Sequence, residues 1–139
     1  MYIYAVNQNI PTDLKIFEDK RFTRLTITGE ADMDFVNTLS LTATQLEEKK
    51  SKNALIVDME GVSYIDSASL GVFVRLIKIH QNSGRRIIIF RPQPLIKDLF
   101  DQTGLSRMLH FCTTEEEIES HLPPIKKKKV RKKAAKTKK

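Results

Sequence analysis

The chain has 139 residues, enough for one domain and a tail, and its charge is unevenly distributed. Ten basic residues and no acidic one lie between Lys126 and Lys139, whereas the preceding 125 residues hold 14 basic and 17 acidic side chains. The net charge of +7 therefore comes from the tail, which argues against a fold that clamps nucleic acid across a basic face.

Composition also argues against several classes of protein. No apolar run approaches the ~20 residues that span a bilayer, and no basic stretch precedes an apolar one at the N-terminus, as in a secretory signal. The single cysteine, Cys112, cannot form an intramolecular disulfide, and no Cys/His set has zinc-ligand spacing. We expect a cytoplasmic protein with no cofactor and no metal.

In the first half of the chain, the hydrophobic pattern changes between strand and helix periods. Residues 14–18 and 22–29 are predicted strands, the second with clear alternation of apolar and polar side chains. Asp32 and Asp34 suit the start of a helix that runs to Lys50, with apolar residues at helical spacing. Residues 54–59 form a near-continuous apolar run, which is typical of a strand in the middle of a sheet covered by helices.

In the second half, the same alternation continues. A helix is predicted from Asp66 and Ser67 to Asn82, ended by Gly84 in the left-handed conformation. A strand over 86–90, a helix over 95–100, a short strand over 108–112 and a helix over 115–122 follow, the last capped by Thr113 or Thr114. Alternating strands and helices predict an α/β fold with a partly parallel sheet.

The chain divides into three parts. Residues 1–11 are expected to form an N-terminal extension, 12–122 the domain and 123–139 a disordered basic tail, because the tail lacks apolar residues to bury. A lysine-rich tail binds nucleic acid or anionic membrane without sequence specificity, so weak polyanion binding is its expected contribution. A tail that is merely solvated remains the alternative.

A search for catalytic motifs finds none. The sequence has no Gly-x-Gly-x-x-Gly, no phosphate-binding loop ending in Gly-Lys-Ser/Thr and no nucleophile elbow. His80, His110 and His121 have no carboxylate or nucleophile at a recognisable spacing, and Cys112 lies in an apolar run typical of the core. We expect a protein that is not an enzyme.

One segment, Val62–Gly71, combines a strand end, a loop and a helix start with several hydroxyl groups. Ser67 could cap the helix by accepting a hydrogen bond from an unpaired backbone N–H. Alternatively, its hydroxyl is a phosphoacceptor, whose new charge the helix N-terminus would stabilise and Asp66 would oppose. The residues alone leave both interpretations open.

The segment Asp58–Val72 resembles the core motif of STAS domains, in particular that of bacterial anti-sigma factor antagonists. Two further segments support the resemblance: Gly29–Asp32 is similar to the family's Gly-Glu-Leu-Asp turn, and Leu99–Leu105, within 95–111, is similar to its Leu-Phe-x-x-(Ser/Thr)-Gly-Leu segment. The similarity covers roughly residues 12 to 122, with the motifs in the family's order.

The resemblance implies a STAS fold, with a four- or five-stranded mixed sheet and helices packed on one side. It also implies an antagonist that acts by partner switching. Its partner would be an anti-sigma factor, commonly a Ser/Thr kinase of the histidine-kinase-like ATPase type, whose phosphorylation of the loop a phosphatase reverses. The partner-binding residues carried over are Asp66, Ser67, Ala68, Ser69, Leu70 and Gly71.

The sequence departs from the family within this loop. The family commonly reads Asp-Ser-(Ser/Thr)-Gly-Leu-Gly, whereas here Ala68 stands at the second hydroxyl position and cannot accept phosphate. Ser67 is the first candidate phosphoacceptor and Ser69 the second. Two other roles stay open: a scaffold-type STAS protein that is not phosphorylated, and the STAS subunit of a lipid-transport ATP-binding-cassette complex.

Overall fold

The computed structural model describes residues 2–4, 13–31, 33–49 and 53–123. The strands are β1 (Tyr2–Tyr4), β2 (Asp13–Glu18), β3 (Phe22–Ala31), β4 (Ala54–Ile65), β5 (Ile87–Phe90) and β6 (His110–Cys112). The helices are α1 (Met33–Lys49), α2 (Ser67–Asn82), α3 (Pro94–Gln102), the 3-10 helix η1 (Leu105–Met108) and α4 (Glu115–Ser120).

The strands form one mixed sheet whose order follows the chain, from β1 to β6. β1, β2 and β3 pair antiparallel, and β3 through β6 pair parallel, with α1, α2 and α3 in the crossovers. The predicted α/β fold is confirmed. Within the described residues the sheet has six strands, one more than the expected maximum, because Tyr2–Tyr4 pair with Lys15–Phe17 at one edge.

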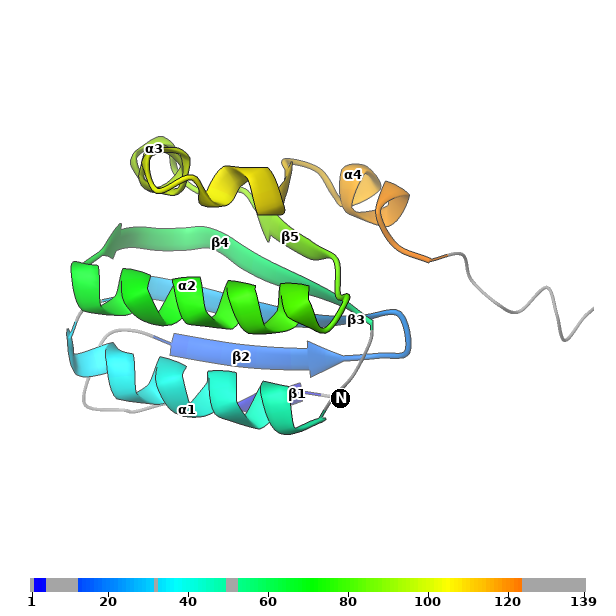
Figure 1. Ribbon diagram of the computed structural model, residues 1–139, viewed down its shortest axis with the longest axis horizontal. Coiled ribbons are helices and arrows are strands. Elements are labelled where there is room, and N and C mark those ends of the chain that lie inside the picture. Colours follow the sequence, from blue (N-terminus) through cyan, green and yellow to red (C-terminus); the bar gives the residue numbers. More distant parts are fainter. Residues whose placement is uncertain (1, 5–12, 32, 50–52, 124–139) are drawn as a thin grey trace, which may run out of the picture.

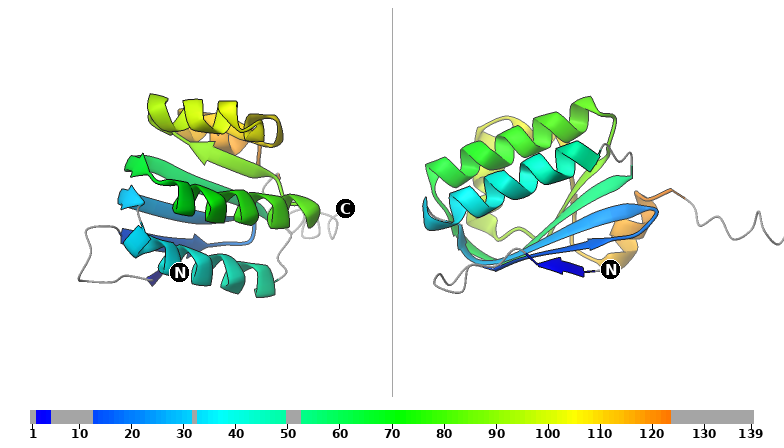
Figure 2. Two further views of the ribbon diagram at one scale, coloured as in Figure 1. Left: turned by 60° about the vertical axis from the view of Figure 1, so that its left-hand side comes forward. Right: turned by 90° about the horizontal axis from the view of Figure 1, so that it is seen from below.

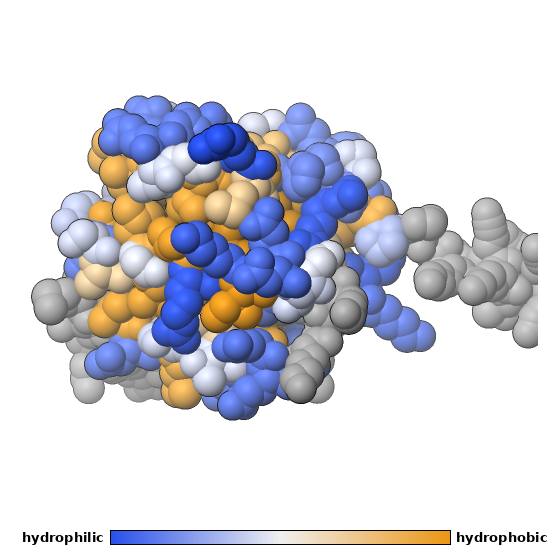
Figure 3. Space-filling model, viewed as in Figure 1, coloured by the Kyte–Doolittle hydropathy of each residue, from blue (hydrophilic) through white to orange (hydrophobic). Residues whose placement is uncertain are grey.

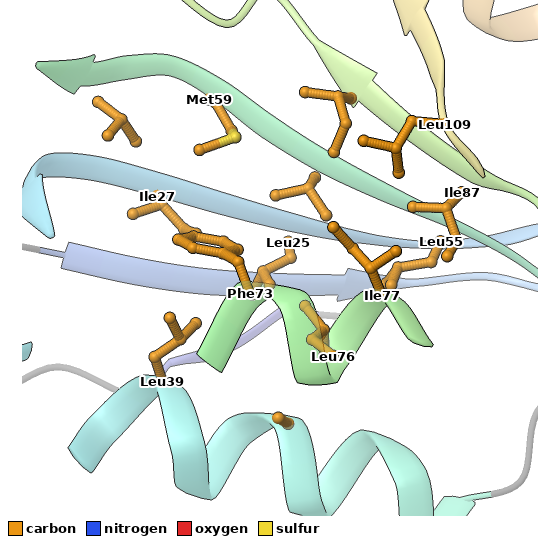
Figure 4. Close-up of a cluster of buried hydrophobic side chains, with 14 of the residues drawn as sticks. Leu25, Ile27, Leu39, Leu55, Met59, Phe73, Leu76, Ile77, Ile87 and Leu109 are labelled. Carbon is orange, nitrogen blue, oxygen red and sulfur yellow. The ribbon is translucent and has the colours of Figure 1, made fainter. Parts of the chain in front are cut away.

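The main core lies between α1 and α2 and one face of the sheet (Figures 1 and 2). Apolar residues at helical spacing on α2 point towards every second residue of β3, β4 and β5, as the close-up in Figure 4 shows. The residues at its centre are almost completely buried: Leu25, Ile27, Leu39, Leu55, Met59, Phe73, Leu76, Ile77 and Ile87. This core holds α2, and therefore its first turn, rigidly against the sheet.

A second apolar cluster lies on the opposite face of the sheet, where α4 packs. Ile118 of α4 covers side chains from three neighbouring strands, namely Ile56, Ile88, Phe90 and Cys112. The expectation that helices pack on one side therefore holds for α1 and α2 but not for α4. The reason is that the alternate residues of β4 and β5 are apolar too, so both faces of these strands need cover.

Strand β4 is longer than predicted and continues to Ile65. Its pairing with β3 shifts register twice, near Thr28 and after Gly29, which keeps the two strands together past the expected end. Gly61 permits this close approach, because a Cβ at this position would lie 2.7 Å from Thr28 Cγ2. The last predicted strand is shorter than expected, since Leu105–Met108 form the 3-10 helix.

Some expectations fall outside the described residues. These are the helix start at Asp32 and the predicted disorder of the tail, of which only Pro123 is described. In the part of the chain that is described, no helix is long and apolar enough to cross a membrane.

Candidate functional site

The residues singled out from the sequence meet at the start of α2, beyond the carboxyl end of β4. Asp66, not Ser67, is the N-cap: its backbone is extended, and its Oδ1 accepts a hydrogen bond of 2.8 Å from Ser69 N. The carbonyl of Asp66 also accepts the first helical bond, from Leu70 N at 2.9 Å. The interpretation of Ser67 as the cap is therefore wrong, because a carboxylate one residue earlier takes that role.

Ser67 is the first residue of α2, and its side chain is exposed. Within the described residues its hydroxyl makes no hydrogen bond. Ser69, two residues on, has 0% relative exposure and faces the interior. The helix thus separates the two candidate phosphoacceptors, presenting one to solvent and enclosing the other.

Three small residues form the exposed part of this helix start: Ser67, Ala68 and Gly71. We call this part the docking surface, after the partner-binding role that the sequence leads us to expect for it. Leu70 is half-buried and packs against the main core. A Cβ added to Gly71 would meet no atom within 4 Å, so nothing in the described residues requires glycine there. Because these side chains are small, the exposed surface at the start of this rigid helix is nearly flat.

Two exposed apolar side chains lie at the same edge of the sheet and were not singled out from the sequence. Tyr64, near the end of β4, is 47% exposed, and Leu95, in the first turn of α3, is 64% exposed. β4 and β5 are parallel, so the starts of α2 and α3 follow the same edge (Figure 1). In Figure 3 hydrophobic patches extend over the left and the centre of this face of the molecule, and hydrophilic residues interrupt them.

The electrostatics of the docking surface are simple. The first turn of α2 contains no acidic residue, so within the cap and first turn the carboxylate of Asp66 is the group that offsets the partial positive charge of the helix N-terminus. Among the described ion pairs, none includes Asp66. A negatively charged group on Ser67 would therefore gain from the helix dipole and be repelled by its neighbour.

Comparison with known proteins is consistent with this arrangement. The sequence profile described as "STAS domain" matches residues 14–118, which is most of the chain. The chain belongs to the STAS domain family. An anti-sigma-B factor antagonist from Staphylococcus aureus is 31% identical to this STAS protein over 105 residues, covering 76% of this chain and 93% of the relative.

Solved structures match the fold of this STAS domain. SpoIIAA, an anti-sigma factor antagonist, superposes in its unphosphorylated form with a TM-score of 0.65 and 19% identity, covering 77% of this chain and 94% of that one. The phosphorylated form of the Bacillus protein gives 0.64 at the same identity, covering 77% and 97%. An anti-sigma factor antagonist from Mycobacterium paratuberculosis gives 0.68 and 15% identity, covering 78% and 92%.

The histidines and the cysteine of this STAS domain have structural environments. Burial and the positive charge of Arg85 lower the pKa of His80 to about 4. Burial and nearby Glu117 raise the pKa of the Cys112 thiol, which keeps it protonated at neutral pH. The rings of His110 and His121 lie with their centroids 4.5 Å apart and their planes tilted by 38°, away from the docking surface.

Proposed function

We propose that this protein is an anti-sigma factor antagonist that binds an anti-sigma factor through the docking surface at the start of α2. The observation that carries the proposal is the exposed hydroxyl of Ser67 directly after the Asp66 cap, in a family member related to an anti-sigma-B factor antagonist. The protein acts by binding and not by catalysis.

The shape of the docking surface supports binding by close approach. Glycine inside a helix costs about 0.5–1 kcal/mol relative to alanine, and at Gly71 no neighbouring atom requires it. A partner that packs directly on the α2 backbone accounts for this cost. Ala68 contributes a second small side chain on the exposed side, and Tyr64 and Leu95 offer apolar contacts at the same edge.

Phosphorylation of Ser67 would provide the switch. The added phosphate carries nearly two negative charges at neutral pH, which a packed interface must either desolvate or repel. Asp66 increases the penalty, because its carboxylate lies at the preceding residue. Ser67 is favoured over Ser69 as acceptor, since a kinase reaches an exposed hydroxyl without opening the helix.

The partner in this proposal is an anti-sigma factor that is also a Ser/Thr kinase of the histidine-kinase-like ATPase type, with a phosphatase to reset the switch. The reaction then transfers the γ-phosphoryl group of ATP to Ser67 Oγ and releases ADP and a proton. All of these steps take place in the cytoplasm, where sigma factors meet RNA polymerase.

The test begins with the tagged full-length chain as bait in a lysate of its own source cells, and mass spectrometry of what it retains. Recovery of an ATPase-type anti-sigma factor supports the proposal. Recovery instead of the ATPase subunit of a lipid transporter contradicts it and favours the alternative STAS role.

The recovered kinase is then purified and mixed with ATP and variants of the chain. Ser67→Ala should bind the kinase but take up no phosphate, whereas Ser67→Glu should lose about a hundredfold in affinity. Ser120→Glu, which adds the same charge to an exposed serine of α4, is the matched control and should bind normally. Phosphate uptake by Ser67→Ala equal to wild type would contradict the switch at Ser67.

A further inference from the structure

Leu95, in the first turn of α3, is the most exposed large apolar side chain in the part of the chain that the structure describes. It is 64% exposed, compared with 60% for Leu41 on α1 and 47% for Tyr64 on β4. The next residue, Ile96, is 1% exposed and fixes the first turn of α3 in the main core. The fold therefore holds this leucine in place while leaving most of its side chain in water.

The loop that leads from β5 into α3 is strongly constrained. Arg91, directly after β5, has a φ of 51°, in the left-handed region that residues other than glycine rarely adopt. Pro92 and Pro94 each have a φ fixed by the proline ring, and Pro94 is the first residue of α3. Because the loop has few conformations to lose, a partner that binds here has little conformational entropy to remove.

The side chain of Arg91 maintains this backbone conformation through three contacts. Its Nε donates a hydrogen bond of 2.7 Å to the carbonyl of Thr113, and its Nη1 pairs with Glu60 Oε2 at 3.1 Å. The guanidinium also lies over the ring of Phe90, 4.9 Å from its centroid. Backbone strain that surrounding contacts maintain is typical of functional sites. Here it fixes the loop before Leu95 against β4, β5 and the residue after β6.

The docking surface by itself offers a partner few side-chain contacts. Ser67, Ala68 and Gly71 are small, so they permit close approach but do little to distinguish one partner from another. Because β4 and β5 are parallel neighbours, α2 and α3 begin on the same side of the molecule (Figures 1 and 2). Neighbouring strands are about 4.8 Å apart, so an interface of ordinary size, about 800 Å² on each partner, can include both helix starts.

We propose that Leu95 is the anchor residue of the partner interface and inserts into an apolar recess of the anti-sigma factor. This inference rests on the proposed function and gives the two helix starts different tasks. The start of α2 carries the switch at Ser67, whereas the start of α3 supplies the side chain that the partner recognises. An anchor that is already fixed in the free protein loses little entropy on binding, so its burial contributes directly to affinity.

The test measures the affinity of the full-length chain for the recovered anti-sigma factor by isothermal titration calorimetry. The two informative variants are Leu95→Gln and Leu95→Met, because glutamine and methionine are similar in length and helix propensity and differ mainly in polarity. Leu95→Gln should bind about tenfold more weakly than wild type or worse. Leu95→Met should stay within about threefold of wild type, since an apolar recess accepts another apolar side chain of similar volume.

The matched control is Leu41→Gln, which makes the same change at a leucine of similar exposure in the middle of α1. This variant should bind the anti-sigma factor with wild-type affinity. Both glutamine variants should unfold at the same urea concentration as wild type, because both leucine side chains are exposed in the folded protein. A loss of binding by Leu95→Gln then reports a lost contact with the partner and not a loss of folding.

Equal affinities of Leu95→Gln and Leu41→Gln would overturn the proposal. A loss in Leu95→Met as large as that in Leu95→Gln would count against an apolar recess. Ser67→Glu, measured in the same assay, separates this inference from the proposed function. If Ser67→Glu loses affinity and Leu95→Gln does not, the switch at Ser67 stands and the anchor at Leu95 is wrong. If neither variant weakens binding, the partner binds elsewhere and both proposals are wrong.

Discussion

At the scale of single residues, Gly71 shows how a stability cost can point to a function. The residue is exposed within α2 and has open space where a side chain would be. Gly71→Ala should therefore raise the free energy of unfolding by about 0.5–1 kcal/mol, measured by urea denaturation. A loss of stability would mean that the position has a packing constraint after all.

Bulk at Gly71 should affect binding more than stability. We expect Gly71→Gln to fold as stably as Gly71→Ala, within about 0.5 kcal/mol, and to bind the anti-sigma factor at least tenfold more weakly. The control is Lys78→Gln, because Lys78 is also exposed and lies two turns further along the same face of α2. Equal affinities of Gly71→Gln and wild type would place the partner elsewhere.

Asp66 has two functions that can be separated by substitution. Asp66→Ala removes the side chain that accepts the Ser69 N–H and should cost about 1 kcal/mol of unfolding free energy. Asp66→Asn keeps an acceptor at the cap but removes the charge, so it should unfold close to wild type in urea. If both variants are equally destabilised, the charge and not the cap hydrogen bond stabilises α2.

At the scale of elements, the C-terminal end of α2 is joined to the sheet by a buried polar cluster. Arg85, only 4% exposed, donates hydrogen bonds to Thr23 Oγ1 at 3.0 Å, to the backbone carbonyl of Asn53 at 2.7 Å and to His80 Nδ1 at 3.1 Å. Because arginine can only donate, His80 Nδ1 must be the acceptor, and the ring is neutral with its proton on Nε2. That buried Nε2 has no partner among the described residues.

This geometry predicts acid sensitivity. The pKa of His80 is about 4 in the folded protein and about 6.5 in the unfolded chain, so the unfolded chain binds the proton first as pH falls. The contribution of neutral His80 to the free energy of unfolding is complete above pH ~6.5. It is lost progressively towards pH ~4, by up to about 3 kcal/mol. His80→Gln, which does not titrate, should flatten the pH dependence of urea unfolding over this range.

The control for acid sensitivity is a histidine outside the cluster. His121→Gln removes a partly exposed imidazole and should keep the wild-type loss of stability below pH 6.5. If His80→Gln loses as much stability on acidification as His121→Gln does, another group accounts for the effect.

Sequence patterns predicted most of these elements, but not their details. The strands over β2, β3 and β5 and the extent of α1 and α2 follow from hydrophobic period, which reports burial directly. The continuation of β4 to Ile65 was missed, because it depends on the fit of Gly61 against Thr28 in another strand. The hydrophobic pattern of the last helix, α4, likewise does not indicate which face of the sheet this helix covers.

The candidate site was predicted as a segment but not as a surface. The family resemblance located residues 66–71 in the sequence. It did not show that Ser67 faces solvent while Ser69 is buried, because this depends on where helix α2 begins. Arg85 was missed because a charged residue after Gly84 looks like part of a surface turn. Its burial depends on acceptors that come from β3 and from the residue before β4.

At the scale of the whole molecule, the domain and the basic tail should be separable. The domain has its own core on both faces of the sheet, and the tail sequence offers no apolar face to bury. Deleting residues 126–139 should shift the melting temperature by less than about 2 °C at moderate salt, measured by calorimetry. A drop of many degrees would show that the tail docks on the domain.

The order of the strands also bears on how the protein is made. Each described strand pairs with the strand before it in the chain, so none has to be inserted between two that are already in place. A ribosome adds about 5–20 residues per second, so the interval between β4 and β5 lasts about 1–4 seconds, whereas a helix forms within about a microsecond. Each strand and its helix can therefore settle before the next strand emerges. Until β5 arrives, however, the apolar β4 is an open edge, and a pause in translation at that point would expose it to pairing with other nascent chains.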